Sequence, residues 1–270
     1  MSSDNTKTMS KVDHYENFPV ASVLCPPHLR AAVVAIYHFA RTADDIADEG
    51  HASAEQRLHL LATLRTDLQN GLHQSGPISP NWPTMLQALW REMHAFDIPI
   101  DHLLALLSAF EQDVLHTRDV RIYQNRTELL DYCTRSANPI GRLLLHLYGI
   151  KDAVALQQSD AVCSALQLIN FWQDLSVDIP RGRFYLPANA KLAEELAFAR
   201  ALMLKGAGLV HQVPGRAGWE LRLVVQGGLR ILDKISRTDT FKHRPQLNTA
   251  DITLMLWRSL WMASKPPQRE

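Results

Sequence analysis

Apolar residues recur at intervals of three and four along most of this 270-residue chain, and that spacing is typical of α-helices. In residues 28–48, for example, Val33, Ile36 and Ala40 fall on one helical face. The same spacing predicts further helices at residues 54–68, 85–96, 103–115, 127–148, 153–178, 192–204, 219–235 and 250–262. Pro139 should kink or break the helix predicted at 127–148.

The segments between the predicted helices are short, and alternating strand patterns are nearly absent. The longest segments, at 70–83, 179–189 and 206–218, are punctuated by Gly and Pro, but none is long enough for a domain linker. We therefore expect residues 1–270 to form a single all-α domain of about nine helices, with a flexible N-terminus at 1–14.

Two acidic motifs stand out against this helical pattern. Residues 41–48 read RTADDIAD, which places Asp44 and Asp48 one turn apart on the same helical face, beside an apolar stripe. Residues 170–178 read NFWQDLSVD, in which Asn170, Asp174 and Asp178 follow at the same spacing. Like charges so placed repel each other, and partial shielding from water increases the repulsion unless a cation is present.

Oxygen ligands without His or Cys suit a hard divalent ion, so the motifs favour Mg²⁺, with Mn²⁺ as a substitute, over zinc. Two carboxylate helices that face each other would clamp a diphosphate through bridging ions. Such ions neutralise the charge that builds on a leaving group as its C–O bond breaks. Acidic pairs at this spacing also occur on solvated helix faces, so the spacing alone leaves both interpretations open.

The composition argues against several other classes of protein. The chain has 28 basic and 28 acidic residues, so a general nucleic-acid-binding surface is not indicated. Its three cysteines are widely spaced, form no zinc or dithiol motif and fit a reduced cytoplasmic protein. No apolar stretch has the length of a membrane span. A lipid substrate would therefore have to be collected by peripheral contact with the inner membrane surface.

The context of both acidic motifs is more specific than their spacing. Residues 37–48 read YHFARTADDIAD, residues 170–187 read NFWQDLSVDIPRGRFYLP, and residues 127–133 read TELLDYC. Together with residues 231–235 and Arg244-Pro245, these segments resemble the squalene/phytoene synthase family, over residues 15–250 and in family order. The segments YENFPVAS at 15–22, FEQDV at 110–114 and SANPIGR at 136–142 are most similar to the bacterial hydroxysqualene synthase branch.

The resemblance implies an isoprenoid synthase helical bundle around a central prenyl cavity. It also implies a reaction in which presqualene diphosphate loses diphosphate, the carbocation rearranges, and water captures it as hydroxysqualene. No NADPH would be required, and the chain has no strand–GxGxxG–helix unit. The functional partners would be a presqualene diphosphate synthase upstream and a hydroxysqualene oxidoreductase downstream.

Two alternatives remain open. The first is head-to-head condensation of farnesyl or geranylgeranyl diphosphate to presqualene diphosphate, squalene or phytoene. Asn138 and Gln173 argue against it, because condensing family members usually carry a small residue and a basic residue at these positions. The second alternative is a non-catalytic assembly factor with the same fold. Its usual sign is loss of the aspartates, which this chain retains.

Carried onto this chain, the resemblance assigns roles to individual residues. Magnesium and diphosphate would be held by Asp44, Asp48, Asn170, Asp174 and Asp178. The other substrate-binding residues would be Ser22, Arg30, Tyr37, Arg41, Asp45, Arg181, Arg183 and Tyr185. Arg41 has an alternative role as an intrahelical ion-pair partner of Asp45. The prenyl tunnel would be lined by residues such as Phe39, Leu168 and Phe171.

Product choice would depend on Tyr132 and Asn138. The ring of Tyr132 would stabilise the carbocation, although a tyrosine in this pattern is equally consistent with core packing. A buried Asn138 amide would position the capturing water, because a polar group in an apolar pocket needs a partner. The apolar stretch from Leu254 to Met262, with Trp257 and Trp261, would pack in the core or face a membrane.

Overall fold

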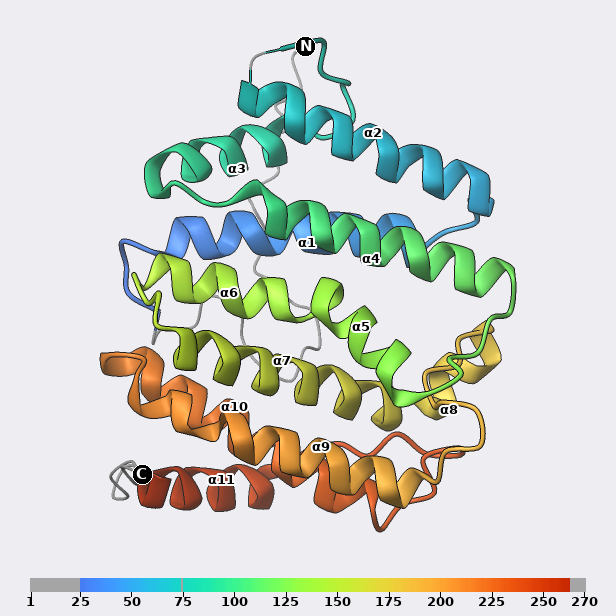
Figure 1. Ribbon diagram of the computed structural model, residues 1–270, viewed down its shortest axis with the longest axis vertical. Coiled ribbons are helices and arrows are strands. Elements are labelled where there is room, and N and C mark those ends of the chain that lie inside the picture. The colour runs from blue at the N-terminus through green and yellow to red at the C-terminus, as the bar shows by residue number, and fades with distance from the viewer. Residues whose placement is uncertain (1–24, 74, 263–270) are drawn as a thin grey trace, which may run out of the picture.

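The computed structural model describes residues 25–73 and 75–262, so the expectations for residues 1–14 and for Ser22 lie outside the described residues. Every regular element in these ranges is a helix, and no strand occurs among them, as predicted (Figure 1). The elements are α1 (Arg30–Asp48), α2 (Ala54–His73), α3 (Pro83–Phe96), α4 (Ile100–Arg118), α5 (Arg126–Ser136), α6 (Asn138–Leu147), α7 (Ala153–Gln173), α8 (Leu175–Asp178), η1 (Ile179–Arg181), α9 (Leu192–Gly206), η2 (Ala207–His211), α10 (Gly215–Ile235) and α11 (Thr249–Met262).

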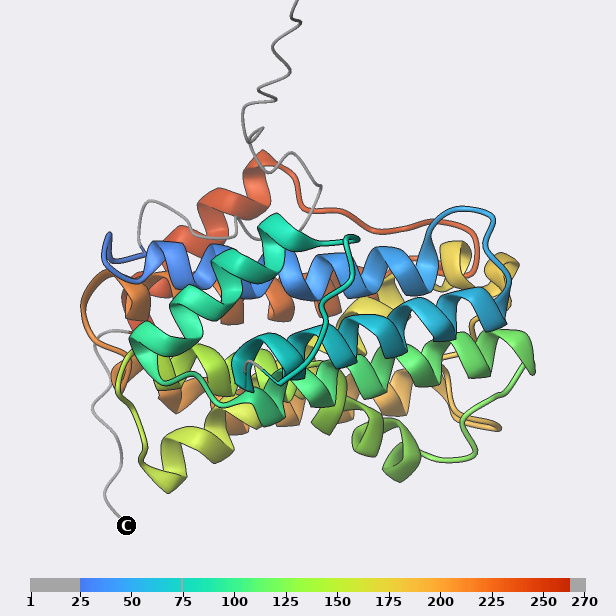
Figure 2. The ribbon, with the colours of Figure 1, turned by 90° about the horizontal axis from the view of Figure 1, so that it is seen from above.

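The helices are stacked in successive rows (Figure 1). In that view α2 and α3 lie at the top, α1, α4, α6 and α7 follow below them, and α9, α10 and α11 form the bottom. Seen from above, the axes of most of the long helices are roughly aligned with one another (Figure 2). Side chains on facing helices can therefore meet along much of the length of the bundle.

Two large hydrophobic cores hold the rows together. The first packs α1, α2, α3 and α4 together around fully buried residues such as Phe39, Leu61 and Leu89. The second joins α5, α7, α9 and α10 around Trp172 and Met203. The apolar stripes that predict the helices are thus the stripes that the structure buries, which is the expected result of amphipathic packing.

The helix predicted at 127–148 is broken where Pro139 stands, as expected. The structure divides it into α5 and α6, which are separated by Ala137. Pro139 lies in the first turn of α6, where its missing N–H has no intrahelical acceptor to lose. The break directs α6 along the cavity described below.

The helix predicted at 153–178 ends earlier than expected, at Gln173. At this end the Gln173 side-chain amide donates to the Pro245 carbonyl at 2.7 Å, and Arg244 binds Asp174. The Asp178 amide still donates to the Asp174 carbonyl at 2.9 Å. The two aspartates of the second motif therefore remain one turn apart, across a bend.

Smaller differences concern the ends of helices. The second helix continues beyond the predicted residue 68 to His73, and α10 begins at Gly215 rather than at Trp219. The first and last residues of a helix depend on local caps and turns, which the spacing of apolar residues does not predict. Among the helices of the described residues, none has both the length and the apolar character needed to cross a bilayer.

Candidate active site

A cavity of about 600 Å³ lies between α1, α6, α7 and α10. Its apolar lining includes Val33, Ile36, Ala40, Ile140, Leu144, Val162, Leu166, Leu221 and Val224. It also includes Tyr37, while Arg41 and Asp44 line it toward the C-terminal end of α1. From Val33 to Asp44 is eleven residues, which at 1.5 Å per residue is about 16 Å along the helix axis. The cavity therefore combines a long, mostly apolar chamber with Arg41 and Asp44 at one end, while Glu220 lines it near Cys25.

The prediction that Phe39, Leu168 and Phe171 line the tunnel is wrong. All three are at most 5% exposed and belong to the two hydrophobic cores. Smaller aliphatic residues line the cavity instead. Large side chains on the inner helix faces fill the hydrophobic cores, because protein interiors are close-packed and leave few internal voids.

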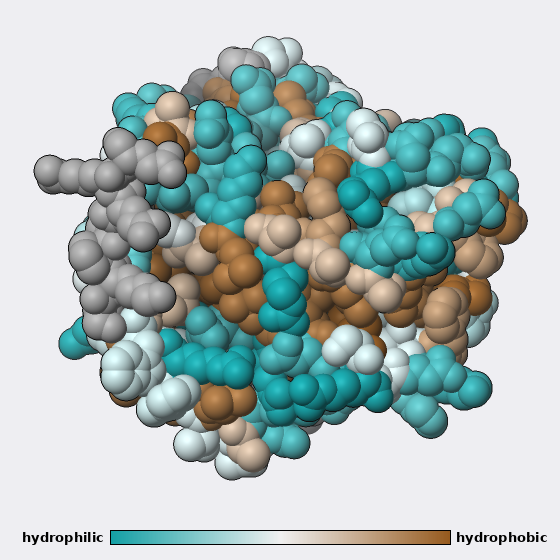
Figure 3. All heavy atoms as spheres, turned by 60° about the horizontal axis from the view of Figure 1, so that its bottom comes forward, coloured by the Kyte–Doolittle hydropathy of each residue, from teal (hydrophilic) through white to brown (hydrophobic). Residues whose placement is uncertain are grey.

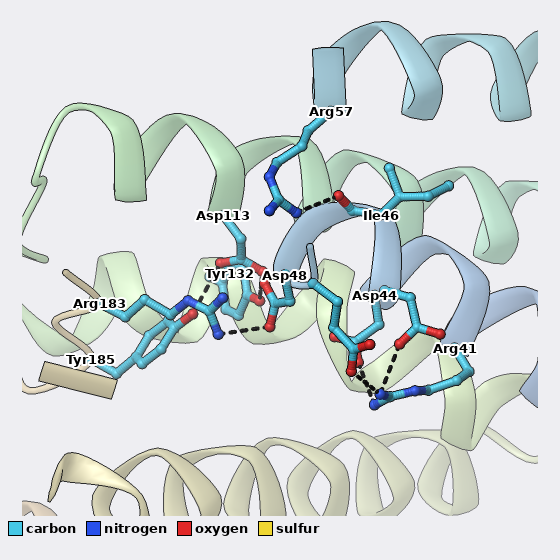
Figure 4. Close-up of polar contacts among 11 residues, drawn as sticks. Arg41, Asp44, Ile46, Asp48, Arg57, Asp113, Tyr132, Arg183 and Tyr185 are labelled. Carbon is cyan, nitrogen blue, oxygen red and sulfur yellow. Dashed lines mark hydrogen bonds and ion pairs between the residues drawn. The ribbon is translucent and has the colours of Figure 1, made fainter. Parts of the chain in front are cut away.

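Arg41 organises the acidic end of α1. Its guanidinium donates to Asp44 Oδ2 at 2.9 Å and contacts Asp45 at 2.7 Å and Glu49 at 2.7 Å (Figure 4). The intrahelical ion pair with Asp45, which the sequence left as an alternative, is thus present together with a second pair to Asp44. Arg41 and Asp44 line the cavity side by side.

Arg57 fixes the C-terminal end of the same helix from α2. Its guanidinium donates to the carbonyl of Ile46 at 2.8 Å (Figure 4). Its other two nitrogens donate to the carbonyls of Gly50 at 2.9 Å and Ala52 at 3.1 Å. Carbonyls at a helix end have no intrahelical partner, and a cation there also complements the helix dipole. Arg57 therefore holds in place the turn that carries Asp48.

We expect Arg57→Met to lower the free energy of unfolding by about 2 kcal/mol, because three charged hydrogen bonds to backbone carbonyls are lost. Urea unfolding followed by circular dichroism would measure it. Arg118→Met is the matched control, since Arg118 pairs with Asp119 on an exposed surface and such pairs contribute little. Equal losses in the two variants would contradict the anchoring role of Arg57.

Arg183 joins the two acidic motifs. Its Nη1 donates to Asp48 Oδ2 at 2.7 Å, although 135 positions separate the two residues (Figure 4). Gly182 precedes it with a φ of +78°, a left-handed conformation that favours glycine, and this turn directs the chain back toward α1. The exposed Arg181 lies close enough to influence the pKa values of Asp48 and Asp178.

Burial and mutual repulsion make these carboxylates reluctant to ionise. Burial, reinforced by Asp48, raises the pKa of Asp44 to about 7 despite Arg41. Burial raises the pKa of Asp178 to about 6, opposed by Arg183 and reinforced by Asp174 and Asp48. Burial also raises the pKa of Asp48. Groups that are costly to charge in this way gain most from a nearby cation.

Asp174 is bound by a residue that the motif analysis did not place in the site. Arg244 Nε donates to Asp174 Oδ1, and its Nη2 donates to Oδ2 at 3.2 Å, in a two-point contact. Asn170 lies one turn earlier on α7 with an exposed side chain. The Arg244-Pro245 segment contributes to the resemblance described above, but spacing gives no sign that it returns to Asp174.

A second residue to which the motif analysis gave no role is Asp113, on α4, although it lies in the FEQDV segment. It is 8% exposed, and it accepts hydrogen bonds from Tyr132 Oη at 2.5 Å and Tyr185 Oη at 3.3 Å (Figure 4). Burial raises the pKa of Asp113 to about 7, although the Tyr132 hydroxyl lowers it. The signal for Asp113 in the sequence is a carboxylate on the apolar face that carries Leu106 and Ala109.

The predicted catalytic Tyr132 and substrate-binding Tyr185 lie together in this cluster. The Tyr185 ring stacks on Phe171 with centroids 3.7 Å apart, and the Tyr132 ring lies 5.9 Å from Phe171. Both tyrosines are buried, and neither is among the residues that line the cavity. The core alternative describes their packing, and a direct role for Tyr132 at the reacting carbons stays a prediction.

Asn138 and Arg30 also lie away from the acidic end. The Asn138 Oδ1 accepts a hydrogen bond from the Ser164 hydroxyl at 2.8 Å; Asn138 is buried and is not among the cavity-lining residues. Arg30 is exposed at the start of α1 and donates to the Cys25 carbonyl at 3.3 Å. Fourteen residues, or about 21 Å of helix, separate it from Asp44, and a role for Arg30 in substrate binding stays a prediction.

The acidic residues do not form a ready metal cage. In residues 25–73 and 75–262, no three His, Cys, Asp or Glu side chains are grouped closely enough to hold an ion. Three of the carboxylates form salt bridges with arginines instead: Asp44 with Arg41, Asp48 with Arg183 and Asp174 with Arg244. The donors themselves are carboxylate oxygens, the ligand type that suits Mg²⁺ or Mn²⁺.

Comparison with known proteins supports the resemblance. A sequence model of squalene/phytoene synthases matches residues 12–193. A hydroxysqualene synthase of Zymomonas mobilis is 42% identical over 176 residues, 64% of this chain and 55% of that protein. One from Sinorhizobium fredii is 32% identical over 263 residues, 88% and 86% of the two chains. The crystal structure of the squalene synthase HpnC from Alicyclobacillus acidocaldarius superposes with a TM-score of 0.72 at 31% identity, over 84% of this chain and 90% of that one.

Proposed function

Because the chain belongs to the squalene/phytoene synthase family, we propose that it converts presqualene diphosphate and water into hydroxysqualene and diphosphate. The observation that carries the proposal is the apolar cavity with Arg41 and Asp44 at one end. The chamber suits prenyl chains and the charged end suits a diphosphate. The hydroxysqualene synthases of Zymomonas mobilis and Sinorhizobium fredii, 42% and 32% identical, favour this reaction over others of the family.

In the proposed reaction, the C–O bond to the diphosphate breaks and its electron pair leaves with the diphosphate. The resulting cyclopropylcarbinyl cation rearranges. The oxygen of a water molecule then supplies the electron pair for a new C–O bond, and the proton it loses passes to the released diphosphate. No electrons are gained or lost overall, so the reaction requires no NADPH.

The chain's own residues bind and orient the diphosphate in this scheme. Asp44, Asp48, Asn170, Asp174 and Asp178 would hold Mg²⁺ or Mn²⁺. The bound ion would neutralise the charge on the departing diphosphate.

If these carboxylates held an ion, three guanidinium groups would lose their present partners. Arg41, Arg183 and Arg244 can then donate in pairs to phosphate oxygens, a contact for which arginine is well suited. Arg181 adds positive charge at the same end. The aliphatic walls keep bulk water away from the cation, so that capture is limited to a positioned water.

The proposal is tested by incubating the pure protein and Mg²⁺ with presqualene diphosphate, and separately with farnesyl diphosphate. Hydroxysqualene should form from presqualene diphosphate without NADPH, and farnesyl diphosphate should be left unchanged. Product from farnesyl diphosphate alone would assign the chain to head-to-head condensation. No product from either substrate would favour the non-catalytic alternative.

The proposed reaction needs two partners in the same compartment. One enzyme must supply presqualene diphosphate, and an oxidoreductase must consume the hydroxylated product if squalene is the end of the pathway. We place these reactions in the cytoplasm, at the inner membrane surface, because both the substrate's prenyl chains and the product are lipids.

A further inference from the structure

The last described helix, α11, turns its apolar side outward. Five large apolar residues on it are between 51% and 62% exposed, namely Ile252, Leu256, Trp257, Leu260 and Trp261. Counted from Ile252, they stand at positions i, i+4, i+5, i+8 and i+9, so they lie on one side of the helix, called here the α11 face. The bottom of the molecule, where α9, α10 and α11 lie, shows hydrophobic side chains gathered among hydrophilic ones (Figure 3).

The opposite side of α11 is partly polar and tightly held. Asp251 is 1% exposed and pairs with Arg230 at 2.6 Å and Lys234 at 2.5 Å, both on α10. Ser259 is also 1% exposed, and Gln226 of α10 donates to the sulfur of Met262 at 2.9 Å. These contacts fix which side of α11 faces outward. The exposure of the apolar stripe is thus a feature of the packing, not a result of loose attachment.

Positive charge is in excess beneath and beside the α11 face. Asp251 is paired with two cations, and Asp233 is likewise contacted by Arg200 at 2.5 Å and Arg258 at 3.8 Å. Four cations therefore surround two carboxylates, a net charge of +2 (4 − 2) within these two clusters. An apolar stripe with tryptophans beside basic side chains is the combination that binds the surface of an anionic bilayer.

The α11 face is separated from the cavity by α10. Ala217, Leu221 and Val224 of α10 line the cavity, whereas Gln226 and Arg230 of the same helix hold α11. On α10, Trp219 lies seven residues before Gln226 and so on the same side; it is 40% exposed, and the Arg222 guanidinium lies over its ring. A lipid surface at α11 would therefore lie one helix away from the chamber.

We propose that the α11 face docks the protein on the surface of a bilayer that contains anionic lipids. The inference rests on the proposed function, because that function requires a membrane-soluble substrate and releases a membrane-soluble product. The apolar side chains enter the interface, and the more exposed Arg200 and Arg258 attract the headgroups. α11 lies in the plane of the surface, as an amphipathic helix does, and does not cross it.

Vesicle flotation tests the docking without any substrate. The protein should float with vesicles of phosphatidylglycerol and phosphatidylcholine in equal parts, bind pure phosphatidylcholine more weakly, and be released as salt is raised. Leu256→Gln with Leu260→Gln should weaken binding about tenfold or more, because two apolar anchors on an already exposed surface are lost. Fluorescence from Trp257 and Trp261 should shift to the blue only when vesicles bind.

The matched control is Ile78→Gln with Ile122→Gln, which changes two residues 41% and 40% exposed that lie outside α9–α11. This control should bind vesicles as the unchanged protein does. Failure of the unchanged protein to bind, or equal binding by both double variants, would overturn the proposal. A dimer seen by light scattering that disappears in the α11 variant, with no vesicle binding, would assign the face to a second copy and overturn it as well.

Activity measured in detergent separates the docking from the chemistry. With presqualene diphosphate dissolved in detergent micelles, the α11 variant should turn over as fast as the unchanged protein. With the same substrate in vesicles, it should be slower by about the factor lost in binding. Vesicle binding by a protein that turns over neither form would leave the docking in place and reject the proposed function.

Discussion

Replacing Asp44 by asparagine is expected to lower the rate of diphosphate release from presqualene diphosphate by about a hundredfold to a thousandfold. Asp44 is the carboxylate that lines the cavity beside Arg41, and it would hold the cation that stabilises the departing diphosphate. Asparagine keeps the shape of the side chain but removes the negative charge. Single-turnover measurements at saturating Mg²⁺ would isolate the chemical step.

The loss should not arise from unfolding. Burial raises the pKa of Asp44 to about 7, so the charged form is costly in the folded protein and its removal does not weaken the fold near neutral pH. Asp45→Asn is the graded comparison, because Asp45 makes the same ion pair with Arg41 but does not line the cavity. It should cost about tenfold or less. Equal losses in the two variants would contradict the assignment of Asp44.

Replacing Asp113 by asparagine is expected to stabilise the protein, and increasingly so as the pH rises. Burial raises the pKa of Asp113 to about 7, whereas the same group in an unfolded chain has a pKa of about 3.9. Since the folded pKa is the higher one, the stability that the protonated group contributes is complete below about pH 4 and is lost as the pH rises to about 7. Asparagine resembles the protonated carboxyl and cannot ionise.

The difference in unfolding free energy between the variant and the unchanged protein should therefore grow by about 4 kcal/mol between about pH 4 and pH 7, and then become constant. Urea unfolding at several pH values would measure it, and groups that titrate alike in both proteins cancel. In a Tyr132→Phe background the plateau should move to higher pH, because the Tyr132 hydroxyl lowers the pKa of Asp113. A difference that does not vary with pH would exclude the buried, neutral state.

The all-α fold is predictable from the sequence because burial of one helix face leaves an apolar residue every three or four positions. Pro139 marks the break between α5 and α6 equally clearly, because it lacks the N–H that a continuous helix needs. The end of α7 at Gln173 is not predictable in this way. Gln173 contacts Pro245, which is 72 residues distant, and local spacing contains no information on such a contact.

The candidate site likewise contains residues that local spacing predicts and contacts that it does not. Asp44 and Asp48 are recognised from spacing because both lie within one turn of a single helix. Arg244 and Arg183 reach their aspartates across 70 and 135 residues, so only the folded chain reveals that each carboxylate already has a cationic partner. The placement of Asn138 beside Ser164 likewise depends on how α6 meets α7.

The cavity between α1, α6, α7 and α10 follows the length of α1, with Val33 toward one end of this helix and Asp44 toward the other. A helix has a fixed rise per residue and does not stretch. For any substrate whose charged group is held at Asp44, α1 therefore fixes the distance from that group to the other end of the cavity. In the proposed reaction, residues at the far end, such as Val33 and Cys25, would limit the length of prenyl chain that fits. Selection for chain length and the ionisation step would then depend on residues about 16 Å apart along the axis of α1, so a substitution near Val33 could change one without a direct contact with the other.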